Sequence, residues 1–207
     1  MNKCFIVTLV LTLALPGLAF SNQTTSMDQA QSPGGFRENP WGTLKEQIQK
    51  AEQGKLVKSE KVSTGLDALV YEENAGGMDC AIGYFFAENK LVQGRYVFLQ
   101  EHSNRTLFID DYNKVKNSLI EKYGKPGTDN IIWRNNLYKD DPGEWGMAIA
   151  VGHLIYASKW KTADMEINLQ LFGDNHKITF ILDYQSMLPE HVELRKQAQE
   201  KATKGIW

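Results

Sequence analysis

The sequence predicts an α+β fold, in which two αβββ-like units form an antiparallel sheet with helices packed on one face and a polar C-terminal helix. The main observation is the stretch from Met165 to Gln185, where apolar and polar residues alternate on both sides of the turn 173–176. Alternation with period two places one set of side chains on one face of a sheet. This hairpin therefore has one apolar face, which another layer of the protein must cover.

The second observation is that a helix followed by three strands occurs twice, at 43–99 and at 111–185. The hairpins in these two segments also share sequence, because FAENKL at 86–91 matches FGDNHKI at 172–178 with one extra residue. We interpret this as a possible internal duplication. Coincidence is the alternative, since turn residues commonly follow an aromatic residue.

The N-terminus predicts export. Lys3 precedes an apolar run at 4–15, and small residues near Ala19 or Ser21 offer cleavage sites, which is the layout of a secretory signal peptide over 1–21. The run is shorter than the roughly 20 residues of a membrane-spanning helix. Residues 22–35 are polar, end in Pro-Gly-Gly and predict a flexible linker. The rest of the chain is expected to form one α+β domain at 36–186, followed by a C-terminal helix and tail at 187–207.

Charge and cysteine content narrow the possible partners. The 207 residues carry a net charge of −2, so nothing indicates the basic face of a nucleic-acid-binding protein. Once the signal peptide is removed, Cys80 is the remaining cysteine and no internal disulfide can form. We expect a periplasmic or secreted protein with no membrane span in the mature chain.

In the first half, Thr43 and Glu46 form a capping-box pattern for a helix over 44–53. Strands are expected at 55–62, which is polar enough for a sheet edge, and at 66–71. A hairpin of strands at 78–86 and 91–99 follows. Each strand of this hairpin is expected to have one apolar face. In the first strand this face is formed by Cys80, Ile82, Tyr84 and Phe86, and in the second by Val92, Tyr96 and Phe98.

In the second half, Asp110 or Asp111 is expected to cap a helix over 112–123, which Gly124 ends. A short strand at 130–133 follows. The signature DPGE at 141–144 favours a helix over 144–153, although 147–156 could instead be a strand. A strand at 154–160 then leads into the hairpin, and the chain ends in a charged helix over 190–204. Its weak apolar face predicts a solvated, loosely docked helix.

Several segments resemble a family of uncharacterised small secreted proteins of Gram-negative bacteria. They are FRENPWGTLKEQI at 36–48, YFFAENKL at 84–91, DYNKVKNSLIEKYGKP at 111–126 and ILDYQS at 181–186. The resemblance covers most of 36–186 and implies no activity. More distantly, paired helix-and-sheet units look like β-lactamase-inhibitor proteins and the small outer-membrane-assembly lipoprotein, by architecture alone. This chain lacks the lipid-attachment cysteine of the latter.

Candidate chemistry is sparse. The four histidines show no metal-ligand spacing, so neither a metal site nor a cofactor is expected. Cys80 with His153 is the one pair that could act as nucleophile and base. Cys80 is nevertheless in phase with apolar strand residues, and a buried, inert thiol is the favoured interpretation.

Aromatic residues of the second half are the remaining candidates. Trp133, Tyr138, Trp145 and Trp160 could form a binding patch, although a core role is the favoured interpretation of these aromatic residues. The long connection at 134–144 is the segment where we expect function to reside. The favoured hypothesis is a non-enzymatic module that binds a protein or a cell-envelope component, with its oligomeric state left open. The alternatives are an inhibitor that plugs a hydrolase through this loop and a cysteine-dependent enzyme.

Overall fold

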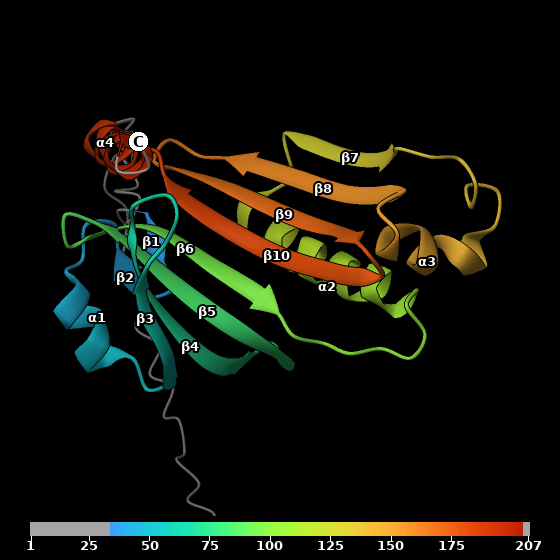
Figure 1. Ribbon diagram of the computed structural model, residues 1–207, viewed down its shortest axis with the longest axis horizontal. Coiled ribbons are helices and arrows are strands. Elements are labelled where there is room, and N and C mark those ends of the chain that lie inside the picture. Colours follow the sequence, from blue (N-terminus) through green and yellow to red (C-terminus); the bar gives the residue numbers. More distant parts are fainter. Residues whose placement is uncertain (1–33, 205–207) are drawn as a thin grey trace, which may run out of the picture. The chain divides into compact units, whose positions relative to one another are not determined.

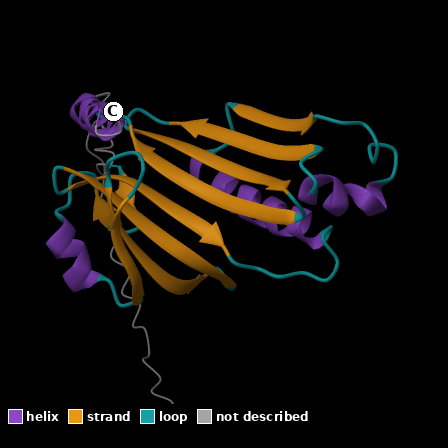
Figure 2. Ribbon diagram, in the orientation of Figure 1, coloured by secondary structure: helices purple, strands orange, loops and turns teal. Residues whose placement is uncertain are grey.

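The computed structural model describes residues 34–204, and these residues confirm the predicted α+β class (Figure 1). They form an eight-stranded antiparallel sheet, a separate two-stranded sheet and four α-helices. Figure 2 shows the strands in orange, with a long helix lying across the strands of the second half. The predicted signal peptide and most of the predicted linker lie outside the described residues. Structure begins slightly earlier than expected, since Gly35 already pairs with Pro40.

The large sheet is built from two consecutive sets of four strands. The first set is β3 (Lys55–Lys61), β4 (Asp67–Ala75), β5 (Met78–Ala87) and β6 (Lys90–Phe98). The second is β7 (Thr128–Trp133), β8 (Leu154–Lys161), β9 (Met165–Asp174) and β10 (Lys177–Ser186). The spatial order is β3-β4-β5-β6-β10-β9-β8-β7. Each half therefore has one strand more than the predicted unit, runs from an edge to the centre, and meets the other half where β6 pairs with β10.

The hairpin over 165–185 forms as predicted. The alternating residues of β9, from Met165 to Leu171, are buried, and so are Phe180 and Leu182 on β10. Its two turn residues, Asn175 and His176, have positive φ angles of 49° and 65°. Glu88 and Asn89 join β5 to β6 with φ of 47° and 67°. Two residues with positive φ make a turn whose twist matches the flanking strands, so both central hairpins use the same connection.

The predicted face of β6 was wrong at one residue. Tyr96 and Phe98 do share the core face, but Val92 packs on the opposite face with Leu66 and Ala87. The cause is a register shift in the β5–β6 pairing, in which Phe85 faces Gln93 and Phe86 faces Leu91. Such a bulge inserts one extra residue and reverses the alternation beyond it. Leu91 therefore takes the core position that alternation assigned to Val92.

Three helices contribute to the main core on one face of the sheet: α1 (Lys45–Ala51), α2 (Leu107–Tyr123) and α3 (Trp145–Ala150). Figure 1 shows α2 lying along β9 and β10, with α3 beside the β9–β10 turn. The α1 cap differs from the prediction, because Thr43 Oγ1 donates to the carbonyl of Pro40. The Gln47 side chain instead accepts from the backbone N–H of Leu44.

The start of α2 was also predicted wrongly. It begins at Leu107, so neither Asp110 nor Asp111 is its cap, and Asp111 instead lies 2.6 Å from the Nε2 atom of His102. Acidic residues are favoured throughout the first turn of a helix, which explains the misassignment. Gly124 ends α2 as predicted, with a φ of 78°. The helix interpretation at 144–153 is confirmed, but a short 3₁₀ turn at 142–144 precedes α3, which ends at Ala150.

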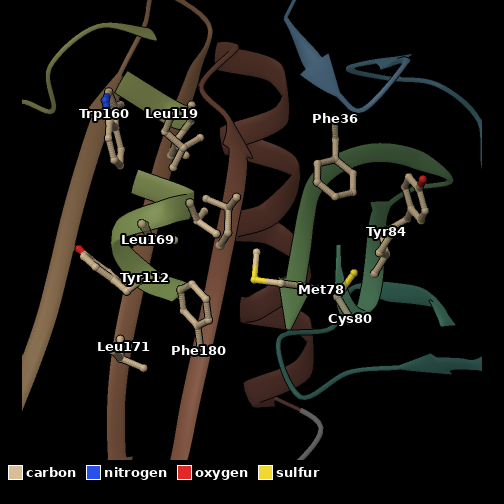
Figure 3. Packing of buried hydrophobic residues seen from close by; sticks show 14 of the residues in the cluster. Phe36, Met78, Cys80, Tyr84, Tyr112, Leu119, Trp160, Leu169, Leu171 and Phe180 are labelled. Carbon is tan, nitrogen blue, oxygen red and sulfur yellow. The ribbon is translucent and has the colours of Figure 1, made fainter. Parts of the chain in front are cut away.

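The small hairpin of β1 (Gly35–Phe36) and β2 (Asn39–Pro40) covers the core face in the first half. Phe36 is 1 % exposed and packs edge-on against Tyr84 and Tyr96, with ring centroids 5.2 Å from each. Figure 3 shows its ring directed onto the strands. A Cβ on Gly94 would lie 2.0 Å from the Phe36 ring. Gly94 therefore makes room for the aromatic ring that closes this side of the core.

The C-terminal helix α4 (Pro189–Lys204) is docked, contrary to the expectation of a loose helix. Its Leu194 and Ala198 pack on the cluster of Leu66, Ala87 and Val92, which lies on the face away from the main core. Arg195 Nη1 donates to the carbonyls of Val92 and Ser186, at 3.1 and 2.7 Å. These carbonyls belong to β6 and β10, so α4 bridges the two halves of the sheet.

We predict that Gly94→Ala destabilises the protein by about 1–3 kcal/mol, because the new methyl group overlaps the Phe36 ring. Urea unfolding gives the free energy. Gly127→Ala is the matched control, since its Cβ would meet only the Lys159 carbonyl at 3.8 Å. If the overlap is the cause, Gly94→Ala costs less in a Phe36→Ala background. An equal cost in both backgrounds would contradict this explanation.

Candidate functional site

Three of the four predicted aromatic residues, Trp133, Tyr138 and Trp145, are partly buried against the main core, and the fourth is fully buried. Trp133 at the end of β7 and Trp145 at the start of α3 lie edge-on, with ring centroids 5.8 Å apart. Tyr138 packs near His153, with centroids also 5.8 Å apart. Trp160, by contrast, is 2 % exposed and donates from Nε1 to the carbonyl of Gly124 at 2.8 Å. The assignment of Trp160 to a binding patch was therefore wrong, because it is a core residue that joins β8 to the end of α2.

The connection at 134–144 is held by its own hydrogen bonds. The Asn135 side chain accepts from the N–H of Leu137 at 2.9 Å, and Asp141 accepts from that of Gly143 at 3.1 Å. Trp145 Nε1 donates to the carbonyl of Lys139 at 3.2 Å. These contacts hold the loop in one shape and leave Leu137 71 % exposed. A loop that is ordered before binding loses less entropy when it meets a partner.

The two edges of the large sheet differ in how they are protected. Edge strand β3 carries three lysines and a register shift between Leu56 and Lys58, and both features discourage pairing with another strand. Edge strand β7 has the sequence TDNIIW, pairs with β8 without a register shift, and exposes Ile131 by 56 % and Ile132 by 43 %. An unprotected, regular apolar edge can accept another strand.

The predicted Cys80–His153 pair does not form. Cys80 lies on β5 and is 1 % exposed, with its thiol donating to the carbonyl of Glu73 at 3.4 Å. His153 precedes β8, and four strand spacings separate β5 from β8, about 19 Å at the usual interstrand distance. Burial raises the pKa of the thiol, which works against the reactive thiolate. Figure 3 shows Cys80 among core residues.

Sequence patterns did not reveal a cluster of hydrogen-bonded polar side chains around Arg37. Arg37, in the turn between β1 and β2, donates to both carboxylate oxygens of Glu73 at 2.7 and 2.9 Å and to Glu52 at 3.1 Å. The Tyr84 hydroxyl donates to Glu52 in turn. Burial and this carboxylate raise the pKa of Tyr84 well above its usual value, so the phenol stays neutral. The partners of Arg37 lie 15 to 47 residues away in the chain, so no local pattern reveals them.

The chemistry of the Arg37 cluster favours a structural role. Both carboxylates are occupied by the same guanidinium, and the tyrosine is bound to one of them, so no group is left poised as a free acid or base. Arg37 itself has a positive φ of 58°, a conformation that costs energy for an arginine. The ion pairs offset that cost and fix the β1–β2 hairpin, which in turn holds Phe36 on the sheet.

Two further findings apply to residues 34–204. No group of three or more histidine, cysteine, aspartate or glutamate side chains is arranged there to hold a metal ion. Within the same range, no helix combines the length and apolar character that crossing a bilayer requires.

Comparison with known proteins found no matching protein-family model, no matching curated protein and no matching solved structure.

We predict that Cys80 in the folded protein does not react with a disulfide thiol reagent until denaturant is added, because its sulfur is buried. The measurement is the rate of absorbance change in a Cys4→Ser background. Ser63→Cys, made together with Cys80→Ala, is the positive control, since Ser63 is exposed. Rapid reaction of native Cys80, accelerating with pH around neutrality, would contradict burial and revive the cysteine-enzyme alternative.

Proposed function

We propose that this chain is an exported, non-enzymatic binding protein that recruits an extended segment of a cell-envelope protein along β7 and the 134–144 loop. The observation that carries the proposal is the edge strand β7, which has no lysine and no register shift and exposes Ile131 and Ile132 in its second half. Its export rests on the signal-peptide pattern over 1–21.

The edge of β7 suits strand addition. Its inner side pairs with β8, and the ladder continues past the strand where Arg134 N–H donates to the His153 carbonyl at 2.7 Å. Its outer side faces no strand of the described chain, because β7 ends the sheet order. An added strand gains affinity from main-chain hydrogen bonds and specificity from alternate side chains.

The side chains around this edge offer contacts on both faces of an added strand. Ile131 lies on the same face of β7 as Trp133, which packs against the core, and Ile132 lies on the other face, because strand residues alternate. Leu137, in the loop that follows β7, is also exposed. The partner segment is therefore expected to be extended and to alternate apolar residues with polar ones.

The test places a photocrosslinking amino acid at Leu137 in producing cells and identifies what is captured. We expect a discrete envelope protein, whose capture falls about tenfold or more in an Ile131→Lys/Ile132→Lys variant, because lysines protect sheet edges. The matched control is Leu56→Lys/Val57→Lys on β3, whose side chains are 45 % and 42 % exposed. No discrete product, or an equal loss in both variants, would count against the proposal.

An inhibitor that plugs a hydrolase is the second candidate, favoured by the exposure of Leu137 on a self-stabilised loop. In that case, replacing residues 135–139 with a Gly/Ser segment abolishes inhibition, while the Ile131→Lys/Ile132→Lys variant still inhibits the hydrolase. The two candidates therefore differ in which of these variants loses binding.

A further inference from the structure

A groove lies between α2 and the centre of the sheet, away from β7 and the 134–144 loop. It has a volume of about 260 Å³. Its floor comes from strands of both halves of the sheet, and one wall is the side of α2. The apolar and aromatic residues that line it are Ala75, Met78, Tyr96, Phe98, Val115, Leu119, Leu182 and Tyr184.

The charged residues at this groove are of one sign. Lys114 and Lys122 line it, and none of its lining residues in the described chain is acidic. The two lysines and Ser118 recur every four residues and therefore share one side of α2. Lys114 Nζ donates to the carbonyl of Gly76 at 3.1 Å, which holds α2 against the β4–β5 turn. Lys122 Nζ lies 5.1 Å from the centre of the Tyr123 ring.

Neither ammonium group has a carboxylate partner among residues 34–204 within ion-pair distance. The third lysine of α2 does have one, since Lys116 Nζ lies 3.1 Å from a carboxylate oxygen of Asp129. Two unpaired cations at the rim of an apolar groove are complementary to a molecule with an anionic head and an apolar tail.

We propose that this groove binds a free, single-chain fatty acid, with the acyl chain against Met78, Phe98 and Leu119 and the carboxylate at the rim that carries Lys114 and Lys122. The size of the groove supports one chain rather than two, because it is smaller than the roughly 300–1,000 Å³ of pockets that enclose larger ligands. Lysine ammonium groups suit a carboxylate as point charges with several rotatable donors. The proposal is independent of the partner suggested for β7.

The test is isothermal titration of the full chain with laurate below its micelle concentration. We expect saturable binding of one laurate per chain. Ser118→Trp should abolish it, because Ser118 is exposed and lines the groove, so that a large ring there occupies the acyl site without replacing a core residue. The pair Lys114→Gln/Lys122→Gln should weaken binding by about tenfold through loss of charge-assisted contacts. Lys122→Gln alone should weaken it partly and keeps the Lys114 contact with Gly76 intact.

The matched control is Lys125→Gln, which removes a nearby exposed lysine that does not line the groove, and it should bind laurate as the original protein does. Dodecylammonium has the same tail with a cationic head and should bind at least about tenfold more weakly, because it meets like charge. Thermal unfolding of each variant verifies that it is folded.

Four results would overturn the proposal. The first is no saturable laurate binding to the original protein. The second is equal binding by Ser118→Trp, which would place the ligand elsewhere on the chain. The third is equal affinity for laurate and dodecylammonium, which would indicate apolar adsorption. Binding only to vesicles that contain anionic two-chain lipids would also contradict it, since it would assign these lysines to a membrane surface.

Discussion

The pairing of β6 with β10 is the interaction on which the rest of the structure depends. It joins two sets of strands that are each continuous in sequence, and without it the chain would form two separate four-stranded sheets. On one face of this seam, Phe98 stacks on Phe180 with centroids 4.2 Å apart. On the other face, the carboxylate of Asp183 is 4 % exposed and accepts hydrogen bonds from the side chains of Gln93, Arg95 and Gln185, each at 2.8 Å. A buried carboxylate is tolerated only when its oxygens are satisfied in this way.

The helices follow from this arrangement. The core face of the joined sheet is covered by α2 and α3 in the second half and by α1 with the β1–β2 hairpin in the first. The opposite face is covered where α4 crosses the seam, and Arg195 binds a carbonyl on each side of it. His191 at the start of α4 is buried, and this burial lowers its pKa and favours the neutral imidazole. The centre of the sheet is thus stabilised on both faces, while its edges remain at the surface, where binding is proposed.

The regular part of this fold was predictable because it is encoded by local patterns. Alternation over 165–185 fixed the buried face of the central hairpin, and the capping signature at Asp141 indicated a helix where apolar periodicity was ambiguous. Features that depend on distant partners were not predictable. The bulge near Val92 depends on pairing with β5, and the burial of Trp160 depends on the end of α2. The candidate surface was predicted only in part. Trp133, Tyr138 and Trp145 lie near the 134–144 loop but are partly buried against the core, and the exposed edge of β7 became apparent only from the strand order.

The central claim is that a stable seam holds both halves in one cooperative unit and leaves β7 as an edge strand whose outer side is open to a partner. Native-state hydrogen exchange of the full protein, resolved by segment, tests it most directly, because local opening and global unfolding expose different amides. The account predicts that amides of β6, β9 and β10 exchange only through global unfolding, with the same denaturant dependence in both halves. Amides of β7 should exchange much faster by local opening. The account would be contradicted if amides of β6 and of β10 exchanged with different opening free energies. It would also be contradicted if the amides of β7 were as well protected as those of β6 and β10.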